Sequence, residues 1–377
     1  MKFLHFSDLH VGKSVNGFSM LGEQRHVFGQ MIEYARTERP DAVVVAGDIY
    51  DRAVPGVEAV RVFDDFLTEL SETGTAVLLI SGNHDSPERL SYASRLLSDR
   101  RIFVYGTFDG ALRRVTLPDE FGDVNFWLLP FIKPLLARGL FGEREIASFG
   151  DAVAAALDAA DIDYAERNVL VSHQFFTKRG VEPMRSESEF DPIGGLDAVD
   201  AGLIERFDYV ALGHLHGAQT VGEDRIRYAG SPLKYSFSEW RHKKSVSLVE
   251  LGEKGVLSVT ALALSPIHDM REIKGTLGAV LSEKALQYTD REDYLRVVLT
   301  DETEIIDPMG KLRSVYPNVM ALDFENSRTY AQPSGEADPE RLESLAPYDL
   351  FSQFFLDVTG SVMTREQAET VRDMLAP

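Results

Sequence analysis

The stretch Ala42–Arg52 reads AVVVAGDIYDR, an apolar run that passes directly into a polar cluster. The run contains only alanine and valine, which is typical of a strand buried on both faces of a sheet. Gly47 and Asp48 follow at once, so a turn that carries a carboxylate ends the run. The stretch therefore predicts a parallel strand with a functional group at its carboxyl end.

Similar apolar runs recur through about the first 265 residues of the chain. They are Lys2–Phe6, Ala76–Ile80, Phe126–Leu129, Val169–Val171 and Tyr209–Leu212. Amphipathic or alanine-rich stretches that predict helices lie between them, at Glu23–Thr37, Val57–Leu70 and Asp151–Ala160. This alternation of strands and helices indicates the α/β class.

The pattern changes in the later part of this region. Arg225–Ala229, Ser245–Leu251 and Val256–Ala263 read as successive strands without helices between them, so we expect an antiparallel sheet that closes the domain. We therefore expect a first domain over residues 1–266. Residues 270–330 then predict a small α+β domain, with a helix at Gly278–Gln287 and strands at Tyr294–Thr300 and Val319–Phe324.

The end of the chain has a different composition. Residues 331–345 are poor in bulky apolar side chains and predict a linker. Residues 346–377 predict a helical segment, because an apolar stretch at Leu350–Val358 is followed by Thr364 and Gln367 in the spacing of a capping box.

Composition narrows the classes of chemistry. The chain has no cysteine, which excludes disulfides, thiolate catalysis and iron–sulfur clusters. Its apolar runs are too short for a membrane helix, so we expect a cytoplasmic protein. The formal net charge is −21, so binding of a nucleic acid requires a local basic patch or bound cations. The acidity is equally compatible with solubility in a salty cytoplasm.

Five polar clusters each follow or end one of the apolar runs: Ser7–His10, Gly47–Arg52, Gly82–Asp85, Ser172–His173 and Gly213–His216. Because the carboxyl ends of parallel strands lie at one edge of a sheet, we expect the clusters to converge on one site. Taken singly, each cluster is also compatible with an ordinary turn, and a lone histidine with a buried structural residue.

The side chains of these clusters are metal ligands of a particular kind. Carboxylate, imidazole and amide groups suit Mn²⁺ or Fe²⁺, and also Zn²⁺. The candidate ligands are Asp8, His10, Asp48, Asn83, His173, His214 and His216. The set is too large for one ion, so it predicts two metals about 3.5–4 Å apart with a bridging carboxylate.

The backbone of the clusters gives two further expectations. Asp-x-His and His-x-His place two ligands on the same side if the backbone is extended. The glycines at positions 47, 82 and 213 leave room where the chain turns around the metals.

The clusters SDLH, GDIYDR, GNHD, SHQ and GHLH, in this order, resemble the signature of the calcineurin-like metallophosphoesterase superfamily. The resemblance implies a fold of two packed β-sheets flanked by helices, with the metals at the sheet edge. It implies that Asp8, His10, Asp48 and His216 hold one metal and that Asp48, Asn83, His173 and His214 hold the other. Asp48 is then the bridging ligand.

The resemblance also assigns catalytic roles. A hydroxide activated by the two metals attacks the phosphodiester, His84 assists the leaving group, and Asp51 orients His84. Arg52 is either a phosphate contact or a salt-bridged surface residue. The Arg241–Lys244 cluster follows an aromatic stretch, so Arg241, Lys243 and Lys244 are candidate DNA contacts, although solvated turns explain such clusters equally well. Arg113-Arg114 and Lys178-Arg179 are further basic clusters.

The segments FLHFSDLHVGK, AGDIYDRAVP, YVALGHLHGAQ and YAGSPLKYSFSE resemble a narrower subfamily, the nuclease subunits of a bacterial complex for DNA double-strand-break repair. This resemblance implies a Mn²⁺-dependent, nucleoid-associated 3′–5′ exonuclease on duplex ends and an endonuclease on single strands and hairpins, acting in DNA repair, recombination and replication. It also implies a small C-terminal domain that caps the site and recognises DNA.

The implied partners are DNA, a second copy of the chain, and an SMC-like ATPase with long coiled coils. The helical segment 346–377 binds that ATPase or folds onto its own domain, and Val57–Leu70 and Glu88–Leu97 are candidate dimer contacts. Two other functions stay open: a phosphodiesterase for small molecules or nucleotides, and a scaffold whose metal site has decayed. The intact ligand set argues against the scaffold.

Overall fold

The strand Ala42–Ala46 (β4) is completely buried and has a parallel strand on either side. The structure, a computed structural model, describes residues 1–142, 144–178, 183–189, 197–287, 290–326, 346–359 and 362–375. The chain divides into two compact units, Met1–Asp269 and Met270–Pro377. None of the described helices has the length and apolar composition that a bilayer crossing requires.

β4 belongs to a six-stranded sheet with the order β16-β15-β1-β4-β5-β6. The other strands are β16 (Leu257–Ala263), β15 (Ser245–Leu251), β1 (Lys2–Phe6), β5 (Ala76–Ile80) and β6 (Ile102–Tyr105). The strands from β1 to β6 are parallel, whereas β15 and β16 are antiparallel additions at one edge.

The second sheet also has six strands, in the order β13-β14-β12-β9-β8-β7. They are β13 (Gln219–Val221), β14 (Glu223–Tyr228), β12 (Tyr209–Leu212), β9 (Arg167–Ser172), β8 (Gly122–Leu129) and β7 (Arg113–Asp119). The four central strands are parallel, and an antiparallel strand closes each edge. Two short ribbons, β2 (Ser14–Val15) with β3 (Phe18–Ser19) and β10 (Phe176–Thr177) with β11 (Val199–Asp200), lie outside these sheets.

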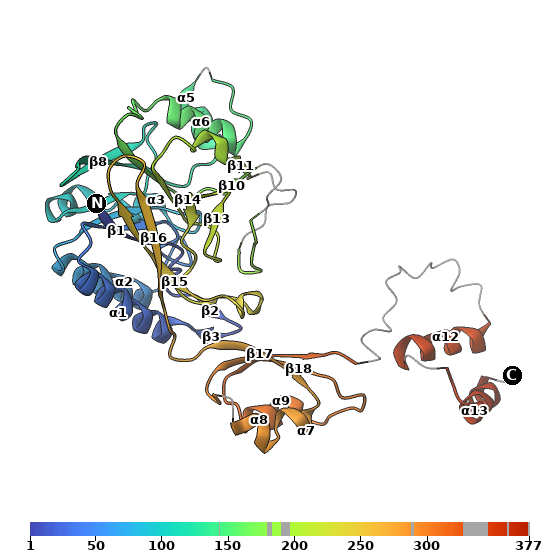
Figure 1. Ribbon diagram of the computed structural model, residues 1–377. Helices are drawn as coiled ribbons and strands as arrows, with labels where there is room; N and C mark the ends of the chain where they lie inside the picture. The colour runs from blue at the N-terminus through green and yellow to red at the C-terminus, as the bar shows by residue number, and fades with distance from the viewer. Residues whose placement is uncertain are drawn as a thin grey trace. The chain divides into compact units, whose positions relative to one another are not determined.

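The two sheets pack face to face around one core. Phe3 of β1 meets Phe126 of β8 and Tyr209 of β12 edge-on, with ring centroids 5.4 and 5.6 Å apart. Helices α1 (Leu21–Glu38) and α2 (Val57–Glu72) lie on one side of the sheets, and α5 (Pro134–Phe141) and α6 (Phe149–Asp158) lie on the other (Figure 1). The short helices α3 (Pro87–Leu90) and α4 (Ser94–Leu97) precede β6. The predicted fold of two packed sheets flanked by helices is confirmed.

One expectation about topology is wrong. Arg225–Ala229 does not join Ser245–Leu251 and Val256–Ala263 in a single antiparallel sheet. β14 pairs in parallel with β12 in the second sheet, whereas β15 and β16 extend the first. The chain crosses between the two sheets after β14, and such a crossing leaves no mark on the apolar pattern of the individual strands.

The second unit contains a parallel sheet in the order β17-β18-β19. Its strands are β17 (Met270–Gly275), β18 (Tyr294–Leu299) and β19 (Val319–Phe324). The helix predicted at Gly278–Gln287 is divided into α7 (Leu277–Val280) and α8 (Glu283–Gln287), and α9 (Pro308–Arg313) precedes β19. The unit also contains α12 (Pro347–Thr359) and α13 (Arg365–Leu375), whose first turn has the predicted capping box of Thr364 and Gln367. The predicted linker 331–345 lies outside the described residues.

Candidate metal centre

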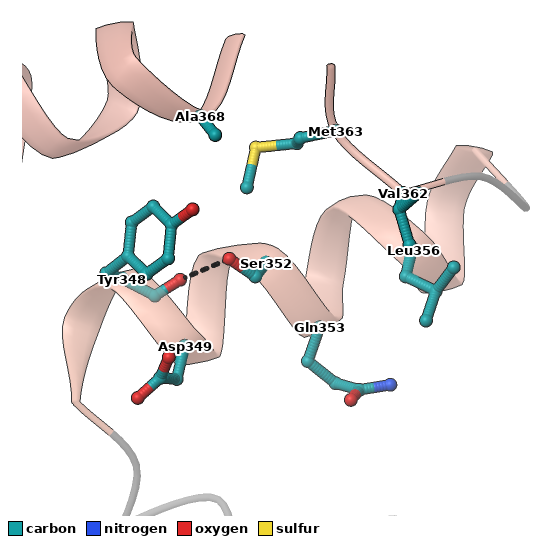
Figure 2. A pocket seen from close by; sticks show the side chains of 8 residues that line it. All are labelled: Tyr348, Asp349, Ser352, Gln353, Leu356, Val362, Met363 and Ala368. Atoms are coloured by element: carbon teal, nitrogen blue, oxygen red, sulfur yellow. Dashed lines mark hydrogen bonds between the residues drawn. The ribbon is translucent and has the colours of Figure 1, made fainter. Parts of the chain in front are cut away.

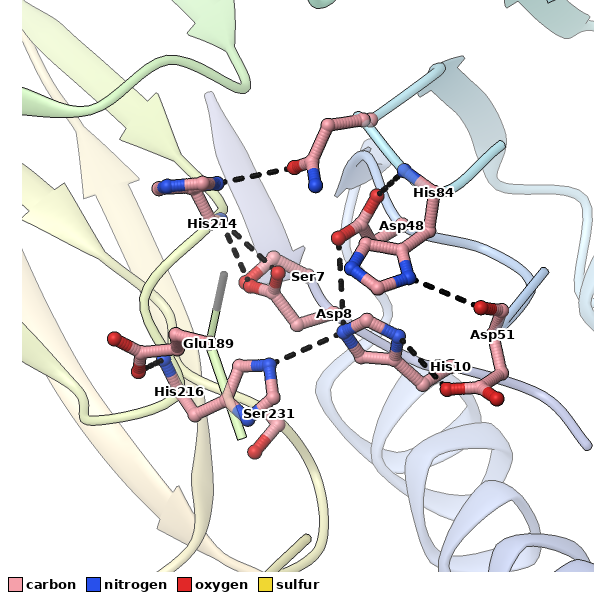
Figure 3. Close-up of polar contacts among 12 residues, drawn as sticks. Ser7, Asp8, His10, Asp48, Asp51, His84, Glu189, His214, His216 and Ser231 are labelled. Atoms are coloured by element: carbon pink, nitrogen blue, oxygen red, sulfur yellow. Dashed lines mark hydrogen bonds and ion pairs between the residues drawn. The ribbon is translucent and has the colours of Figure 1, made fainter. Parts of the chain in front are cut away.

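The five polar clusters of the sequence meet at the carboxyl ends of the strands that precede them. Asp8 and His10 follow β1, Asp48 follows β4, and Asn83 follows β5, all in the first sheet. His173 follows β9, and His214 and His216 follow β12, in the second sheet. The site therefore spans the edges of both sheets, and its side chains point toward one another (Figure 3).

Asp48 lies at the centre of the site. Its Oδ1 accepts a hydrogen bond from the main-chain N–H of His84 at 2.9 Å. Its Oδ2 is 3.3 Å from Nε2 of His173 and 3.6 Å from Nε2 of His10. The carboxylate thus contacts histidines from both halves of the predicted ligand set, which is the position that a bridging ligand requires.

Asp8, His10 and His216 form the first group of donors. Their ligand atoms all lie within 4.8 Å of one another. Nε2 of His10 faces Nε2 of His216 at 3.1 Å. Two imidazole nitrogens at this distance need a proton or a cation between their lone pairs. Buried oxygen and nitrogen ligands without sulfur suit a divalent metal ion.

Asn83, His173 and His214 form the second group, next to Asp48. Oδ1 of Asn83 is 3.1 Å from Nε2 of His173 and 3.1 Å from Nδ1 of His214. The structure thus brings together the seven predicted ligands, and their donor types fit a pair of divalent cations. His84, together with His10 and Asp48, forms a further possible donor group, so geometry alone does not separate its role from that of a ligand.

The backbone of the site is left-handed at several of these positions. The φ angles are 52° at Asp8, 43° at His10, 50° at Asp48 and 100° at His214. Non-glycine residues adopt this region at a cost of about 1–2 kcal/mol each, and such strain gathers at functional sites. The expectation that Asp-x-His and His-x-His rely on extended backbone is therefore wrong for both. The side chains converge because the loop coils tightly after the strand.

Three glycines make the convergence possible, as expected from the sequence. A Cβ atom at Gly47 would overlap the ring of His173, and one at Gly82 would overlap the carboxylate of Asp48. A Cβ atom at Gly213 would overlap the main-chain oxygen of Ala46.

Asp85, the last residue of GNHD, joins two of the clusters. Its carboxylate accepts hydrogen bonds from the main-chain N–H groups of Ile49, Tyr50 and Gly82 at 3.1, 2.9 and 2.8 Å. Burial, and secondarily Asp48, raises the pKa of Asp85 to about 6. The sequence contains this residue in a motif, but its role as a loop clamp becomes visible only in the structure.

Hydrogen bonds from the protein fix which histidine nitrogens face the site. Nδ1–H of His173 donates to the main-chain oxygen of Ala46 at 2.7 Å, which leaves Nε2 for a metal. Nδ1 of His216 lies 2.8 Å from the hydroxyl of Ser188 and 3.3 Å from Oε1 of Glu239, so its Nε2 is likewise turned inward.

Glu239 contacts the candidate ligand His216, and sequence reasoning missed it. It is completely buried and accepts hydrogen bonds from Ser188 at 2.5 Å and from Nζ of Lys244 at 2.6 Å. The sequence feature that could have identified Glu239 is its position at the end of YAGSPLKYSFSE, a segment used for the resemblance but not for the site. Lys244 also donates to Ser231 and to the main chain of His216, both at 2.9 Å. Its ammonium group is thus buried and fully used, so the expectation that Lys244 contacts DNA phosphates is not supported.

The charges in the site favour cation binding. Burial alone would raise the pKa of Asp48, but His173, His10 and His84 outweigh it and hold that pKa well below its ordinary value. Burial lowers the pKa of His214 to about 3, so this imidazole is neutral and its lone pair is available. Burial would also lower the pKa of His173, yet Asp48 and Asp8 raise it to about 9. Binding of a metal ion by Nε2 of His173 would require loss of this proton, because only the neutral imidazole is a ligand.

His84 is half-buried at the rim of the site, next to His10 at a ring-centroid distance of 4.8 Å. Its Nδ1–H donates to the main-chain oxygen of Asp51 at 3.0 Å. Asp51 is therefore next to His84 as expected, but the contact is made by its main chain. The Asp51 carboxylate instead accepts a hydrogen bond from Lys13 at 2.8 Å and lies 3.7 Å from Nδ1 of His10.

The remaining predicted contacts are on the surface. The side chain of Arg52 is 82% exposed, with its Nε 3.7 Å from Asp51. Arg241 is exposed and its guanidinium lies 4.5 Å from the centre of the Trp240 ring, and Lys243 is exposed beside it. These three cations remain available to a polyanion. Lys178 is paired with Glu205 at 2.9 Å, and Arg179 lies outside the described residues.

Comparison with known proteins assigns the class. The profile of the calcineurin-like phosphoesterase family matches residues 1–218. A second profile, SbcD_C, described as the Type 5 capsule protein repressor C-terminal domain, matches residues 266–359. The chain belongs to the calcineurin-like phosphoesterase family, as its motifs predicted. The family implies hydrolysis of phosphoesters with divalent metal ions, for which possible ligand groups are in place.

The particular relative is equally informative. The chain is similar to SbcD, the D subunit of the nuclease SbcCD, of Staphylococcus epidermidis, with 28% identity over 382 residues that span 100% of this chain and 98% of the relative. SbcD represents the subfamily that the sequence segments resemble, so this resemblance is confirmed.

Solved structures with similar folds include TT1561 of Thermus thermophilus, with 15% identity over 69% of this chain and 98% of that chain and a TM-score of 0.42. A dimetal phosphatase from Danio rerio has 13% identity over 70% of this chain and 99% of that chain and a TM-score of 0.37.

Proposed function

We propose that this chain is the nuclease subunit of a complex of the SbcCD type, which processes DNA ends in double-strand-break repair and recombination. Its activities are 3′–5′ exonuclease on duplex ends and endonuclease on single strands and hairpins, with Mn²⁺ as the metal. The observation that carries the proposal is the position of Asp48 between two groups of buried or partly buried candidate ligands. The full-length similarity to a protein named as a nuclease subunit supports DNA as the substrate.

The proposed chemistry assigns distinct tasks to the protein. Asp8, His10, Asp48 and His216 would hold one divalent cation, and Asp48, Asn83, His173 and His214 the other. Such a pair of cations would supply an activated water and neutralise the charge that develops on the phosphate. The main-chain oxygen of Asp51 accepts a hydrogen bond from Nδ1–H of His84 and so fixes the orientation of that ring. Nε2 of His84 is then the nitrogen that delivers a proton to the leaving oxygen.

The direct test uses the purified chain with MnCl₂. We expect cleavage of linear duplex, hairpin and single-stranded DNA, and complete inhibition by EDTA. Hydrolysis of bis(p-nitrophenyl) phosphate without any cleavage of DNA would replace the proposal with a phosphodiesterase for small molecules. Failure to hydrolyse either substrate would favour the scaffold.

The C-terminal helices support a protein partner. α12 and α13 enclose a groove of about 410 Å³, lined by residues such as Tyr348, Leu356 and Met363 (Figure 2). Apolar side chains remain exposed on the helices, among them Phe354 at 59% and Met374 at 80%. Apolar surface of this kind is suited to the coiled coil of an SMC-like ATPase.

Deletion of residues 346–377 tests this partner. We expect the truncated chain to lose the ATPase in a pull-down but to cleave short DNA at the rate of the full chain. Retention of the ATPase by the truncated chain would show that another surface binds it.

We further propose that the chain forms a homodimer through Val57–Leu70 and Glu88–Leu97, where Val57, Tyr92 and Leu96 are 68%, 82% and 73% exposed. Residues 270–330 are proposed to cap the site and recognise DNA. The cytoplasmic, nucleoid-associated location and the boundaries of the linker stay predictions from the sequence.

A further inference from the structure

An apolar cavity of about 430 Å³ opens beside the metal centre. Asn83, His84 and His214 of the centre form one side of it. Its other lining residues are Phe131, Lys133, Phe149 and Asp197, to which neither the motifs nor the proposed chemistry assigns a task.

Two phenylalanine rings dominate the new part of the lining. Phe131 follows β8, and its main-chain N–H donates to Ser81 at 3.0 Å, which fixes it beside the third ligand cluster. Phe149 is the first residue of α6, whose start is held by the reciprocal capping box of Ser148 and Asp151. The main chain is held at both positions, and both side chains are only partly buried. Both therefore contribute aromatic surface to the cavity.

The geometry of the rings defines how a ligand can stack. Their centroids are 5.9 Å apart and their planes differ by 42°. A planar ring inserted between two aromatic rings needs about 7 Å and nearly parallel planes. A flat ligand consequently stacks on the cavity face of one ring and meets the edge of the other.

The polar groups of the cavity favour a ligand with both a negative charge and a hydrogen-bond donor. Lys133 is an exposed cation at the beginning of α5. Asp197 is 5% exposed, and its Oδ1 has no hydrogen-bond donor among the described residues, although it lies 3.5 Å from the guanidinium of Arg185. A donor on the ligand would complete the contacts of this buried oxygen.

We propose that this cavity binds the base of the nucleotide whose phosphate lies on the metal centre. The proposal rests on the proposed function and names the substrate group that the protein holds. A nucleobase has the flat face that Phe131 and Phe149 require, and adenine, cytosine and guanine carry the amino donor that suits Asp197. Lys133 then faces a phosphate of the same strand.

The test compares two mononucleotide probes with the full chain in MnCl₂. We expect deoxyadenosine 5′-monophosphate to bind about tenfold more tightly than 2-deoxyribose 5-phosphate, in line with the usual contribution of base–aromatic stacking. In the double variant Phe131→Leu/Phe149→Leu, which keeps apolar bulk but removes the aromatic faces, the ratio of the two affinities should fall to about one. Phe121→Leu, at an exposed phenylalanine outside the site, is the matched control and should keep the ratio.

A second measurement does not depend on the folding of a variant. In the wild-type chain with diamagnetic Mg²⁺ in place of Mn²⁺, saturation of the phenylalanine ring protons should transfer magnetisation to the base protons of the nucleotide. Equal affinity for the two probes, absence of this transfer, or phenyl phosphate binding as tightly as the nucleotide would overturn the base pocket.

The proposed function is tested separately. A preference for the nucleotide without any cleavage of DNA would refute the nuclease and leave the pocket in place. Cleavage of DNA without a preference for the nucleotide would refute the pocket and leave the nuclease in place.

Discussion

The two ends of the sheet sandwich both bury charged groups, but the partners of these groups differ between the two ends. At the amino end of β9, Arg167 donates to Asp119, to the main-chain oxygen of Gly122 at 2.8 Å and to that of Gly252 at 2.9 Å. At the carboxyl ends of β1 and β12, by contrast, Nε2 of His10 faces Nε2 of His216 at 3.1 Å.

The difference separates a structural charge from a functional one. Around Arg167, positive donors meet carboxylate and carbonyl acceptors, so each charge is compensated within the protein. Around Asp48, carboxylate oxygens and imidazole lone pairs outnumber the hydrogen-bond donors that face them. Such a surplus of acceptors is stable only with added positive charge, which protons or metal ions provide.

Asp48→Ala should produce the largest effect. Because this carboxylate contacts both donor groups, its removal should empty both metal positions and reduce DNA cleavage by about 10³-fold or more. Metal content by mass spectrometry and cleavage rates test this, with Asp65→Ala, at an exposed position of α2, as the control. Normal metal content in the Asp48 variant would refute the bridging role.

His84→Ala should lower the cleavage rate by about 10²–10⁴-fold while both metals stay bound, because His84 is proposed to act on the leaving oxygen. The exposed His26 provides the matched control, His26→Ala. If metal content falls together with the rate, His84 is a ligand, which its proximity to His10 and Asp48 also permits.

Glu239→Gln should weaken metal binding by about 10–100-fold at the Asp8–His10–His216 group alone. The substitution removes the charge that pairs with Lys244 and loosens the orientation of His216. Calorimetric titration with Mn²⁺ should then show one weakened and one unchanged site. Equal weakening of both sites would mean that Glu239 acts on the whole fold.

Asp119→Asn should leave metal binding unchanged and lower the free energy of unfolding by about 1–3 kcal/mol at pH 7. Hydrogen bonds from Arg167 hold the pKa of Asp119 below its ordinary value. The stabilisation is therefore present above about pH 4, and it is lost as the pH falls and the carboxylate is protonated. Urea unfolding of both proteins should show the gap narrowing from pH 7 to pH 3. If the difference in free energy of unfolding between the two proteins does not depend on pH, the charge of Asp119 does not explain the stabilisation.

Several features of the site were predictable because each is local. Asp8, His10, Asp48 and Asn83 all stand within a few residues of the end of an apolar run, so strand pattern and residue type suffice to place them at one edge. Glu239 and Phe131 were not predicted, since neither lies in one of the five ligand clusters and only the packing of distant segments brings them to those clusters. The left-handed backbone of Asp8 and His10 was also missed, because favoured conformations of isolated residues do not include the strain that tertiary contacts impose.

The sequence alone determined the α/β class, the family and the set of residues that meet at the strand ends, because apolar periodicity and short motifs depend on neighbours along the chain. Only the tertiary structure decided that β14 and β15 belong to different sheets, that Lys244 is buried against Glu239, and that phenylalanines flank the metal centre. These features depend on which distant segments pack together, and that choice is made by the free energy of the whole fold rather than by any one stretch of it.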